Sequence, residues 1–372
     1  MRRLLLTILA PLAFAACEPR GDIVFDTAPD QPGTVETVFV GSTRAYEPDE
    51  GGFGPKRDPD LRYAQFDVSI PPDHKSGEIE WPRGSRVDAA TDFVTRKEML
   101  FAQPREFRAA LRAELMQRSR ANREAVIFVH GYNNTFAEAL YRVAQLRHDL
   151  DIPGVAVSYA WPSLAQPLGY AYDRDSVLFG RDGLQDLMRQ VVESGADRII
   201  LVAHSMGTLL TMETLRQIAI GRDRRLMDRI GGVVLISPDI DVEVFKTQAR
   251  DIGRLPQPFI VFTSKNDKIL RLSARVSGDG VRLGELEDVS ALKQFPITFI
   301  DVSAFYTGGS GHFTVGNSPS LIRLLDKLQK VDGAFVADRT KRLGLADTIA
   351  MTVQDATRIV LSPLSALTSQ PQ

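Results

Sequence analysis

The chain of 372 residues contains a single cysteine, Cys17, so no intrachain disulfide can form and the fold must depend on its hydrophobic core. Neither sign of charge is in excess, because 45 Lys and Arg face 47 Asp and Glu, which removes the electrostatic case for binding nucleic acid. The sequence lacks a Gly-rich loop ending in Lys-Ser or Lys-Thr and any cluster of Cys and His, so it has no motif for nucleotide phosphates or a metal. We therefore expect no cofactor. The composition, 44% hydrophobic and 25% charged, is typical of a globular protein.

The first 16 residues have the composition of a signal peptide. Two arginines precede the apolar stretch 4–14, which is too short to span a bilayer as a helix of the mature protein. Residues 13–15 (Ala-Phe-Ala) suit an ordinary signal peptidase, whereas residues 14–17 (Phe-Ala-Ala-Cys) resemble the bacterial lipoprotein box, with Phe where Leu is commoner. The position of Cys17 at this junction favours lipidation over a chance cysteine. The sequence predicts a protein exported to the bacterial cell envelope, facing the periplasm and anchored to a membrane through Cys17.

Three regions are expected after the signal peptide. Residues 17–34 are polar with repeated Pro and Gly, as expected of a tether. Residues 35–331 are expected to form one α/β domain. In the C-terminal tail, residues 332–372, apolar residues recur at helical spacing: Leu345, Ile349, Val353, Ala356 and Val360. This partly helical tail could pack on the domain, or contact the membrane surface or a partner.

Strands and helices alternate strictly from Ala125 onward. The pattern predicts strands at 35–41, 63–70, 92–100, 125–129, 154–159, 198–203, 232–237, 258–263 and 296–302. It predicts helices at 104–118, 136–150, 175–193, from the turn at 203–207 to residue 220, and 319–330, with loops at 46–60 and 71–92. Such alternation makes an α/β fold whose mostly parallel central sheet has helices on both faces. Sites in such sheets form outside the carboxyl ends of the strands.

The stretch around Ser205 is the strongest chemical signal. A buried strand ends at Ala203-His-Ser-Met-Gly207, and an amphipathic helix follows, which is the pattern of a nucleophile elbow. Small residues are needed two before and two after the serine because the turn presses strand and helix together, and Ala203 keeps this steric logic where Gly is usual. The elbow predicts Ser205 as a nucleophile rather than an ordinary helix N-cap.

A serine hydroxyl needs a base within hydrogen-bond reach, and the chain order for this elbow is Ser, acid, His. The chain has five histidines, His74, His130, His148, His204 and His312. Only His312 follows Ser205, in a Gly-rich loop after the last strand of the domain, so we expect it to be the base. His130 and His204 are expected to brace the loop and the turn that hold them, and His74 and His148 to be exposed to solvent.

The acid that orients the histidine has three candidates. Asp267 follows the second strand after the elbow strand, which is the usual position. Asp239 and Asp241 follow the preceding strand, where some lipases keep their acid. Each of the three could instead be a helix N-cap or a turn residue.

The oxyanion of a tetrahedral intermediate needs backbone donors. We expect the N–H of Met206, directly after the nucleophile, and the N–H of Tyr132, in the turn after the strand 125–129. Three aromatic residues, Trp161, Tyr170 and Tyr172, could line an apolar acyl pocket, or they could pack in the core or anchor loops.

Five segments together carry a resemblance to a known family. They are His130-Gly-Tyr-Asn-Asn-Thr-Phe, Trp161-Pro-Ser, Gly169-Tyr-Ala-Tyr-Asp-Arg-Asp-Ser176, Ala203-His-Ser-Met-Gly207 and Ser237-Pro-Asp-Ile-Asp241. The sequence resembles the bacterial α/β-hydrolases of the DUF900 family, an esterase/lipase-like group, from about residue 35 to 330. The resemblance implies the α/β-hydrolase fold and a triad of Ser205, an acid and His312.

The hypothesis from the sequence is a serine hydrolase that cleaves a small-molecule or lipid carboxylic ester through an acyl-enzyme on a Ser-Asp-His triad. One alternative is an acyltransferase with the same triad, in which an alcohol or amine replaces water in the second step. Another is a non-catalytic envelope protein that keeps the hydrolase fold as a binding scaffold. Amide or thioester cleavage would use the same groups.

Overall fold

The structure is a computed structural model that describes residues 20–26, 32–48, 52–82, 87–278, 280–306, 308–326 and 356–362. The predicted signal peptide, Cys17, residues 327–331 of the predicted domain and residues 332–355 and 363–372 of the predicted tail lie outside the described residues.

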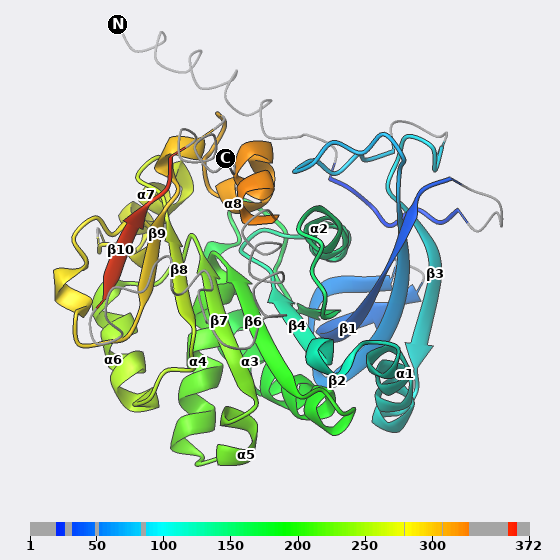
Figure 1. The fold of residues 1–372 in the computed structure, drawn as a ribbon, viewed down its shortest axis with the longest axis horizontal. Helices are drawn as coiled ribbons and strands as arrows, with labels where there is room; N and C mark the ends of the chain where they lie inside the picture. Colours follow the sequence, from blue (N-terminus) through cyan, green and yellow to red (C-terminus); the bar gives the residue numbers. More distant parts are fainter. Residues whose placement is uncertain are drawn as a thin grey trace, which may run out of the picture.

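One twisted sheet runs through the middle of the described chain, with β10 at one edge and β3 at the other (Figure 1). Its strand order is β10-β9-β8-β7-β6-β4-β5-β1-β2-β3. The strands are β1 (Thr34–Glu47), β2 (Gly52–Ile70), β3 (Val94–Phe101), β4 (Glu124–Val129), β5 (Val155–Ala160), β6 (Arg198–His204), β7 (Ile230–Ile236), β8 (Phe259–Thr263), β9 (Thr298–Asp301) and β10 (Thr357–Val360). Of the described strands, only β2 runs antiparallel to its neighbours, so the predicted, mostly parallel sheet is confirmed.

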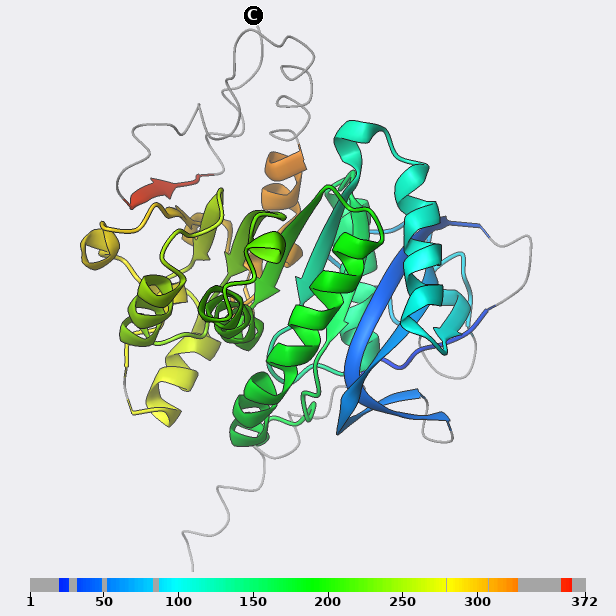
Figure 2. The same cartoon turned by 90° about the horizontal axis from the view of Figure 1, so that it is seen from below.

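Helices lie on both sides of this sheet, as Figure 2 shows. The α-helices are α1 (Pro104–Met116), α2 (Phe136–Asp149), α3 (Tyr170–Glu193), α4 (Met206–Ile220), α5 (Arg224–Met227), α6 (Val242–Ile252), α7 (Lys268–Val276) and α8 (Thr314–Asn317). Residues 319–326 are also helical. Short 3₁₀ turns are η2 (Arg120–Asn122), η3 (Leu283–Glu285), η4 (Val289–Leu292) and η5 (Ser303–Phe305).

The core has two layers because successive strand residues point to opposite faces of the sheet. Helices α1, α3, α4 and α6 bury their apolar sides on one face, against alternate residues of β4 to β8. Helix α2 packs on the other face, as do α8 and residues 319–326. Central strands covered on both faces read as continuous apolar runs, and all six residues of β5 are buried.

The residues predicted to start α1 and α2 and to end α3 do so in the structure. Helix α1 has Pro104 in its first turn, and α2 has a capping box in which Thr135 accepts from the Glu138 N–H while the Glu138 side chain accepts from the Thr135 N–H. Gly195, which follows α3, has φ +100°, as expected of a residue that ends a helix.

Several element boundaries differ from the prediction, among them the end of β1, which extends to Glu47 rather than to residue 41. Residues 52–60, predicted to be loop, belong to β2. Strand β3 pairs with β2 only from Tyr63 to Ser69. Pro55 and Pro59 therefore lie in a part of β2 that has no strand on the β3 side, where a missing N–H costs no ladder bond. Helix α3 starts at Tyr170 rather than 175, because Asp173 in its first turn makes buried hydrogen bonds that the sequence does not reveal.

Both ends of the described chain also differ from the prediction. Residues 20–26, predicted to be part of a tether, lie on the domain, where Thr95 of β3 donates to the Val24 carbonyl at 2.8 Å. The helical spacing predicted through Val360 is wrong at its end, because residues 357–360 form β10 and pair in parallel with β9. The free edge of β9 offers backbone donors and acceptors that a local sequence pattern cannot show.

His74 is not the solvent-exposed residue that the sequence predicts. Its side chain is 5% exposed, with Nδ1 2.8 Å from Glu80 Oε2 and Nε2 3.0 Å from Asp149 Oδ1. His148 is partly buried, and its ring lies 5.6 Å from that of His74.

Two kinds of feature are absent from the described part of the chain. None of its helices is both long and apolar enough to cross a membrane. It also holds no group of three or more His, Cys, Asp or Glu side chains that could bind a metal ion.

Candidate active site

The turn between β6 and α4 has the geometry predicted for the elbow. Ser205 has φ 52° and ψ −125°, a conformation that non-glycine residues adopt rarely and under strain. A Cβ on Gly207 would lie 2.2 Å from the His130 carbonyl oxygen, and a Cβ on Gly131 would lie 2.9 Å from Ser205 Cβ. The chain that leaves β4 therefore passes directly against the elbow, and only glycine permits this approach.

Asp267 and His312 meet beyond the carboxyl ends of β8 and β9. His312 Nδ1 lies 2.8 Å from Asp267 Oδ2, where Asp267 is fully buried and the His312 side chain is 13% exposed. The other carboxylate oxygen accepts from the Ile269 and Leu270 N–H groups at 3.0 Å each, so Asp267 is also the N-cap of α7. A carboxylate oxygen accepts from Nδ1–H, so in this tautomer of His312 the acceptor nitrogen is Nε2.

The two other candidate acids are engaged elsewhere. Asp239 lies 3.3 Å from Arg282 Nε in a buried ion pair and accepts from the Tyr170 hydroxyl at 3.1 Å. Asp241 is the N-cap of α6. Of the three candidates, Asp267 is the one that the structure brings to His312.

His204 connects the elbow to the loop that carries His312. The two rings lie 4.7 Å apart between centroids, and His204 Nε2 donates to the His312 carbonyl at 3.2 Å. Burial, reinforced by the neighbouring His312, holds the pKa of His204 well below its usual range, so the ring is neutral. These contacts hold the loop of His312 against His204. Because Ser205 directly follows His204 in the chain, His312 lies beside the elbow. No described residue is hydrogen bonded to the Ser205 hydroxyl, and hydrogen bonds of this kind are often long before substrate binds.

Two backbone N–H groups at the elbow and the adjoining loop have no acceptor among the described residues. Met206 is the first residue of α4, where helix N–H groups have no partner within the helix. Tyr132 follows Gly131, which touches Ser205. Neither the Met206 N–H nor the Tyr132 N–H donates to a described residue. These are the two donors that the sequence predicts for an oxyanion hole.

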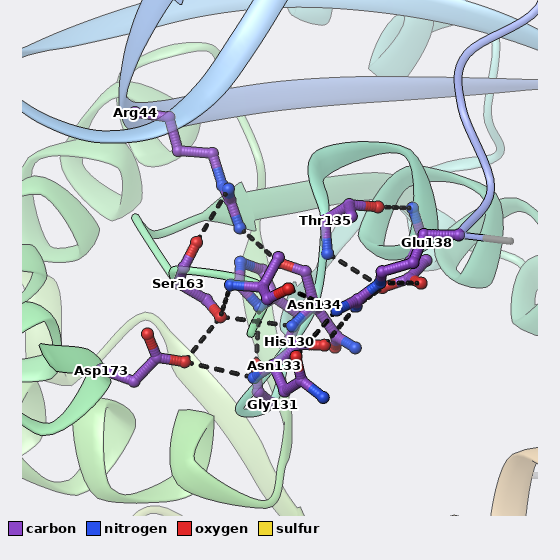
Figure 3. A network of polar contacts seen from close by, with 11 residues as sticks. Arg44, His130, Gly131, Asn133, Asn134, Thr135, Glu138, Ser163 and Asp173 are labelled. Carbon is purple, nitrogen blue, oxygen red and sulfur yellow. Dashed lines mark hydrogen bonds and ion pairs between the residues drawn. The ribbon is translucent and has the colours of Figure 1, made fainter. Parts of the chain in front are cut away.

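Buried charges hold the loop after β4 in place (Figure 3). Asp173 accepts from Ser163 Oγ at 2.6 Å and from the Asn133 N–H at 3.1 Å. Arg44, from β1, donates to the carbonyl oxygens of Asn134 at 2.8 Å and Ser163 at 3.2 Å. Burial lowers the pKa of Arg44 to about 10, opposed by the charge of Asp173, so the guanidinium remains charged at neutral pH. This role of Arg44 was not predicted, because its partners lie 90 and 119 residues away along the chain.

His130 braces the same loop. Its ring stacks on Trp161 with centroids 4.9 Å apart, and Trp161 Nε1 donates to the His130 carbonyl at 2.8 Å. Both ring nitrogens face carbonyl oxygens, but burial and the charge of Arg44 lower the pKa of His130 to about 3. The ring is therefore neutral and donates to one carbonyl at a time.

A short N-terminal arm, residues 20–26, contacts the loop from the other side. Arg20 donates to Asn133 Oδ1 at 2.7 Å, to the Ala165 carbonyl at 2.6 Å and to Glu138 Oε1 at 2.9 Å. It also bonds to the Asn133 carbonyl. Asn133 has φ 58°, so Arg20 fixes a residue in the left-handed region next to Tyr132.

The three aromatic residues proposed for an acyl pocket serve as anchors. Trp161 is fully buried against His130. The Tyr170 hydroxyl is bonded to Asp239, and Tyr172 donates to the Pro55 carbonyl.

A cavity of about 520 Å³ lies beside the elbow instead, and its size suits a small ligand. We call it the α2 cavity, because Glu138, Ala139 and Arg142 of α2 form one wall. Its other lining residues are Arg20, Gly21, Ile79, Trp81, Phe128, Asn133, Asn134, Ala165, Pro167, His204, Phe313 and Asn317. Two of them, His204 and Phe313, are the chain neighbours of Ser205 and His312. The sequence did not predict this cavity, because its apolar wall comes from segments far apart in the chain.

Solved structures resemble the chain at low identity. Aspergillus fumigatus lipase B is 14% identical over 38% of this chain and 37% of that chain, with a TM-score of 0.28. The chain thus aligns with little more than a third of that lipase. A fungal esterase from Rhizomucor miehei is 11% identical over 83% and 87%, with a TM-score of 0.34. An esterase of Pseudomonas putida is 12% identical over 79% and 81%, with a TM-score of 0.39. Scores this low carry no argument about activity, and no curated protein matches the chain.

The family comparison is more extensive. Residues 104–327 match the family described as alpha/beta hydrolase of unknown function (DUF900). The matched span runs from α1 beyond β9 and contains the elbow, Asp267 and His312. The predicted fold and the predicted family resemblance are both confirmed, and the chain belongs to the DUF900 family of α/β-hydrolases.

Proposed function

We propose that the chain is a serine hydrolase that cleaves carboxylic esters through an acyl-enzyme on Ser205. The observation that carries this proposal is the 2.8 Å contact between His312 Nδ1 and Asp267 Oδ2, because it leaves the basic nitrogen of His312 available on a ring held beside a strained serine. Asp267 caps α7 through Oδ1, so its contact with His312 through Oδ2 is not required for the cap.

The chemistry follows from these groups. Ser205 Oγ attacks the ester carbonyl carbon while His312 Nε2 takes the hydroxyl proton, and Asp267 stabilises the imidazolium that forms. The Met206 and Tyr132 N–H groups bind the oxyanion. The C–O bond then breaks and the alcohol leaves with the proton from His312. Water repeats the sequence, with His312 as base, and releases the acid and free Ser205.

Covalent labelling tests the nucleophile directly. A fluorophosphonate probe should label the wild type and not Ser205→Ala, with thermal unfolding showing that both are folded. Folded wild-type protein that stays unlabelled and hydrolyses no p-nitrophenyl ester would support the non-catalytic scaffold instead.

The choice of acid has its own test. Asp267→Asn should lower kcat for p-nitrophenyl butyrate by about 10,000-fold, because the neutral amide no longer fixes the tautomer of His312 or stabilises its charge. Asp241→Asn is the matched control, since asparagine also caps helices, and its kcat should stay close to that of the wild type. A large loss in Asp241→Asn with little change in Asp267→Asn would reverse the assignment.

We further propose that the exported chain is anchored to a membrane through lipid on Cys17, as its sequence context suggests. Metabolic labelling with an alkyne fatty acid should mark the wild type and not Cys17→Ala, and the variant should leave the membrane fraction. Equal labelling of both would exclude Cys17 as the acylated residue.

A further inference from the structure

Arg142 lines the α2 cavity and contacts no carboxylate among the described residues. Within the described chain, Arg142 makes its hydrogen bonds through Nη1, to Gln145 Oε1 at 2.7 Å and to the carbonyl oxygens of Gly77 and Gly316 at 3.4 Å each. Its Nε and Nη2 groups donate to no described residue, and no carboxylate among the described residues forms an ion pair with it. Arg142 lines the α2 cavity, and three of its N–H donors, on Nε and Nη2, have no acceptor among the described residues.

The carboxylates nearest to Arg142 along α2 are committed to other groups. Glu138 binds Arg20 through both oxygens and also accepts from the Thr135 N–H. Asp149 accepts from His74, Gln145 and the Gly77 N–H. Both carboxylates offset the charge of Arg142 at a distance, but neither contacts it.

Arg142 remains a cation in spite of its surroundings. Burial lowers its pKa to about 10, and the charges of Asp149 and Glu138 oppose that change, so the side chain is charged at neutral pH. The titratable ring that faces the cavity, His204, is neutral and adds no charge. With Arg20 and Glu138 paired, the cavity wall carries one unmatched positive charge.

This charge lies close to the proposed reaction centre. The Arg142 guanidinium carbon is 5.1 Å from the centre of the Phe313 ring, and that ring is 4.4 Å from the His204 ring. One aromatic ring thus separates Arg142 from the residue next to Ser205. A cation kept partly out of water costs free energy unless an anion pairs with it, so an anionic ligand in the cavity would be strongly favoured.

We propose that the substrate of this hydrolase is an ester that also carries an anionic group, a carboxylate or a phosphate, and that Arg142 binds this group in the α2 cavity. Phe128, Trp81 and Phe313 contact the carbon chain between the anion and the ester. This inference rests on the proposed ester hydrolysis, which a neutral ester tests independently.

The test compares two esters that differ in one charge. Mono-p-nitrophenyl glutarate carries a terminal carboxylate, and p-nitrophenyl valerate is its neutral analogue of equal chain length. The wild type should prefer the glutarate in kcat/KM. Arg142→Gln should raise KM for the glutarate by about 10- to 100-fold, the usual effect of losing a charged hydrogen bond, and change KM for the valerate by less than about twofold. Arg142→Lys should restore part of the preference.

Controls separate a binding role from a structural one. Arg147→Gln removes an arginine of the same helix that is paired with Glu36, and it should leave the ratio between the two esters unchanged. Inhibition of valerate hydrolysis by glycerol 3-phosphate but not by glycerol identifies phosphate as an accepted anion, whereas inhibition by glutarate alone identifies carboxylate. Equal losses on both esters in Arg142→Gln, without inhibition by either anion, overturn the proposal while leaving ester hydrolysis intact. A wild type inactive on both esters contradicts the proposed function itself.

Discussion

Among single residues, His74 shows how buried partners reverse the usual effect of burial on a histidine. Burial alone would lower the pKa of His74, but hydrogen bonds to Asp149 and Glu80, together with their charges, raise the pKa to about 9. The imidazolium therefore bridges the C-terminal end of α2 and the segment that carries Glu80. The same residue looks like an ordinary loop histidine in the sequence, because its two acidic partners are brought together only by the fold.

This bridge predicts how stability depends on pH. The folded-state pKa of His74 lies above the unfolded value near 6.5, so its contribution is complete below pH 6.5 and is lost as the pH rises through 9. The contribution is up to about 3 kcal/mol. Urea unfolding at pH 6 and pH 9.5 should show that the wild type loses more stability than His74→Gln. His148→Gln serves as the control, and the prediction is wrong if all three proteins lose the same amount.

Among the elements, the loop of residues 131–135 is held from two sides. Asp173 of α3 and Arg44 of β1 reach it from the domain, and Arg20 of the N-terminal arm reaches it from outside. Because Tyr132 of this loop offers one of the two proposed oxyanion donors, the arm acts on the site without touching the reacting atoms. We therefore propose that Arg20 is a positioning residue.

Arg20→Ala should therefore change kcat rather than KM. We expect kcat for a neutral ester to fall by about tenfold, less than the 100- to 1,000-fold typical of removing a donor outright, because the loop keeps its inner contacts. Asp22→Ala, an exposed change in the same arm, should leave kcat unchanged. If Arg20→Ala alters only the thermal midpoint, the arm stabilises the fold and has no part in positioning the loop.

The sequence predicted those parts of the site that depend on local signals. The elbow was recognisable from small residues around Ser205, and α2 from the capping box of Thr135 and Glu138. Arg44 and Arg142 were not recognisable, because arginine is mostly a surface residue and their partners come from distant segments. The sequence also left three acids open, since each follows a strand and each could cap a helix, and only the fold brings Asp267 to His312.

At the scale of the whole molecule, a segment close to the C-terminus completes one edge of the sheet. Ile359 of β10 pairs with Ile300 of β9, and Arg358 lies 2.6 Å from Asp301 in an ion pair. Strand β9 leads into the segment that carries His312. The described end of the predicted tail therefore belongs to the domain, and it covers a strand that would otherwise be a free edge.

Ile359→Pro should uncover that edge, because proline cannot donate to the ladder and disfavours a paired strand. Hydrogen exchange should show peptides of β9 exchanging about tenfold faster than in the wild type, since local opening then costs less free energy. Peptides of the central strand β4 provide the internal control and should be unaffected. Unchanged exchange in β9 would mean that β10 contributes nothing to that edge.

The contacts of Arg20 also set how far the domain can stand from anything attached to Cys17. Arg20 follows Cys17 by three residues, and three residues of fully extended chain span at most about 11 Å. Arg20 lines the α2 cavity, so a lipid on Cys17 would hold this part of the domain close to the membrane surface. With so short a linker, the domain would remain at the membrane surface. An ester in the membrane would then reach Ser205 without crossing the aqueous phase.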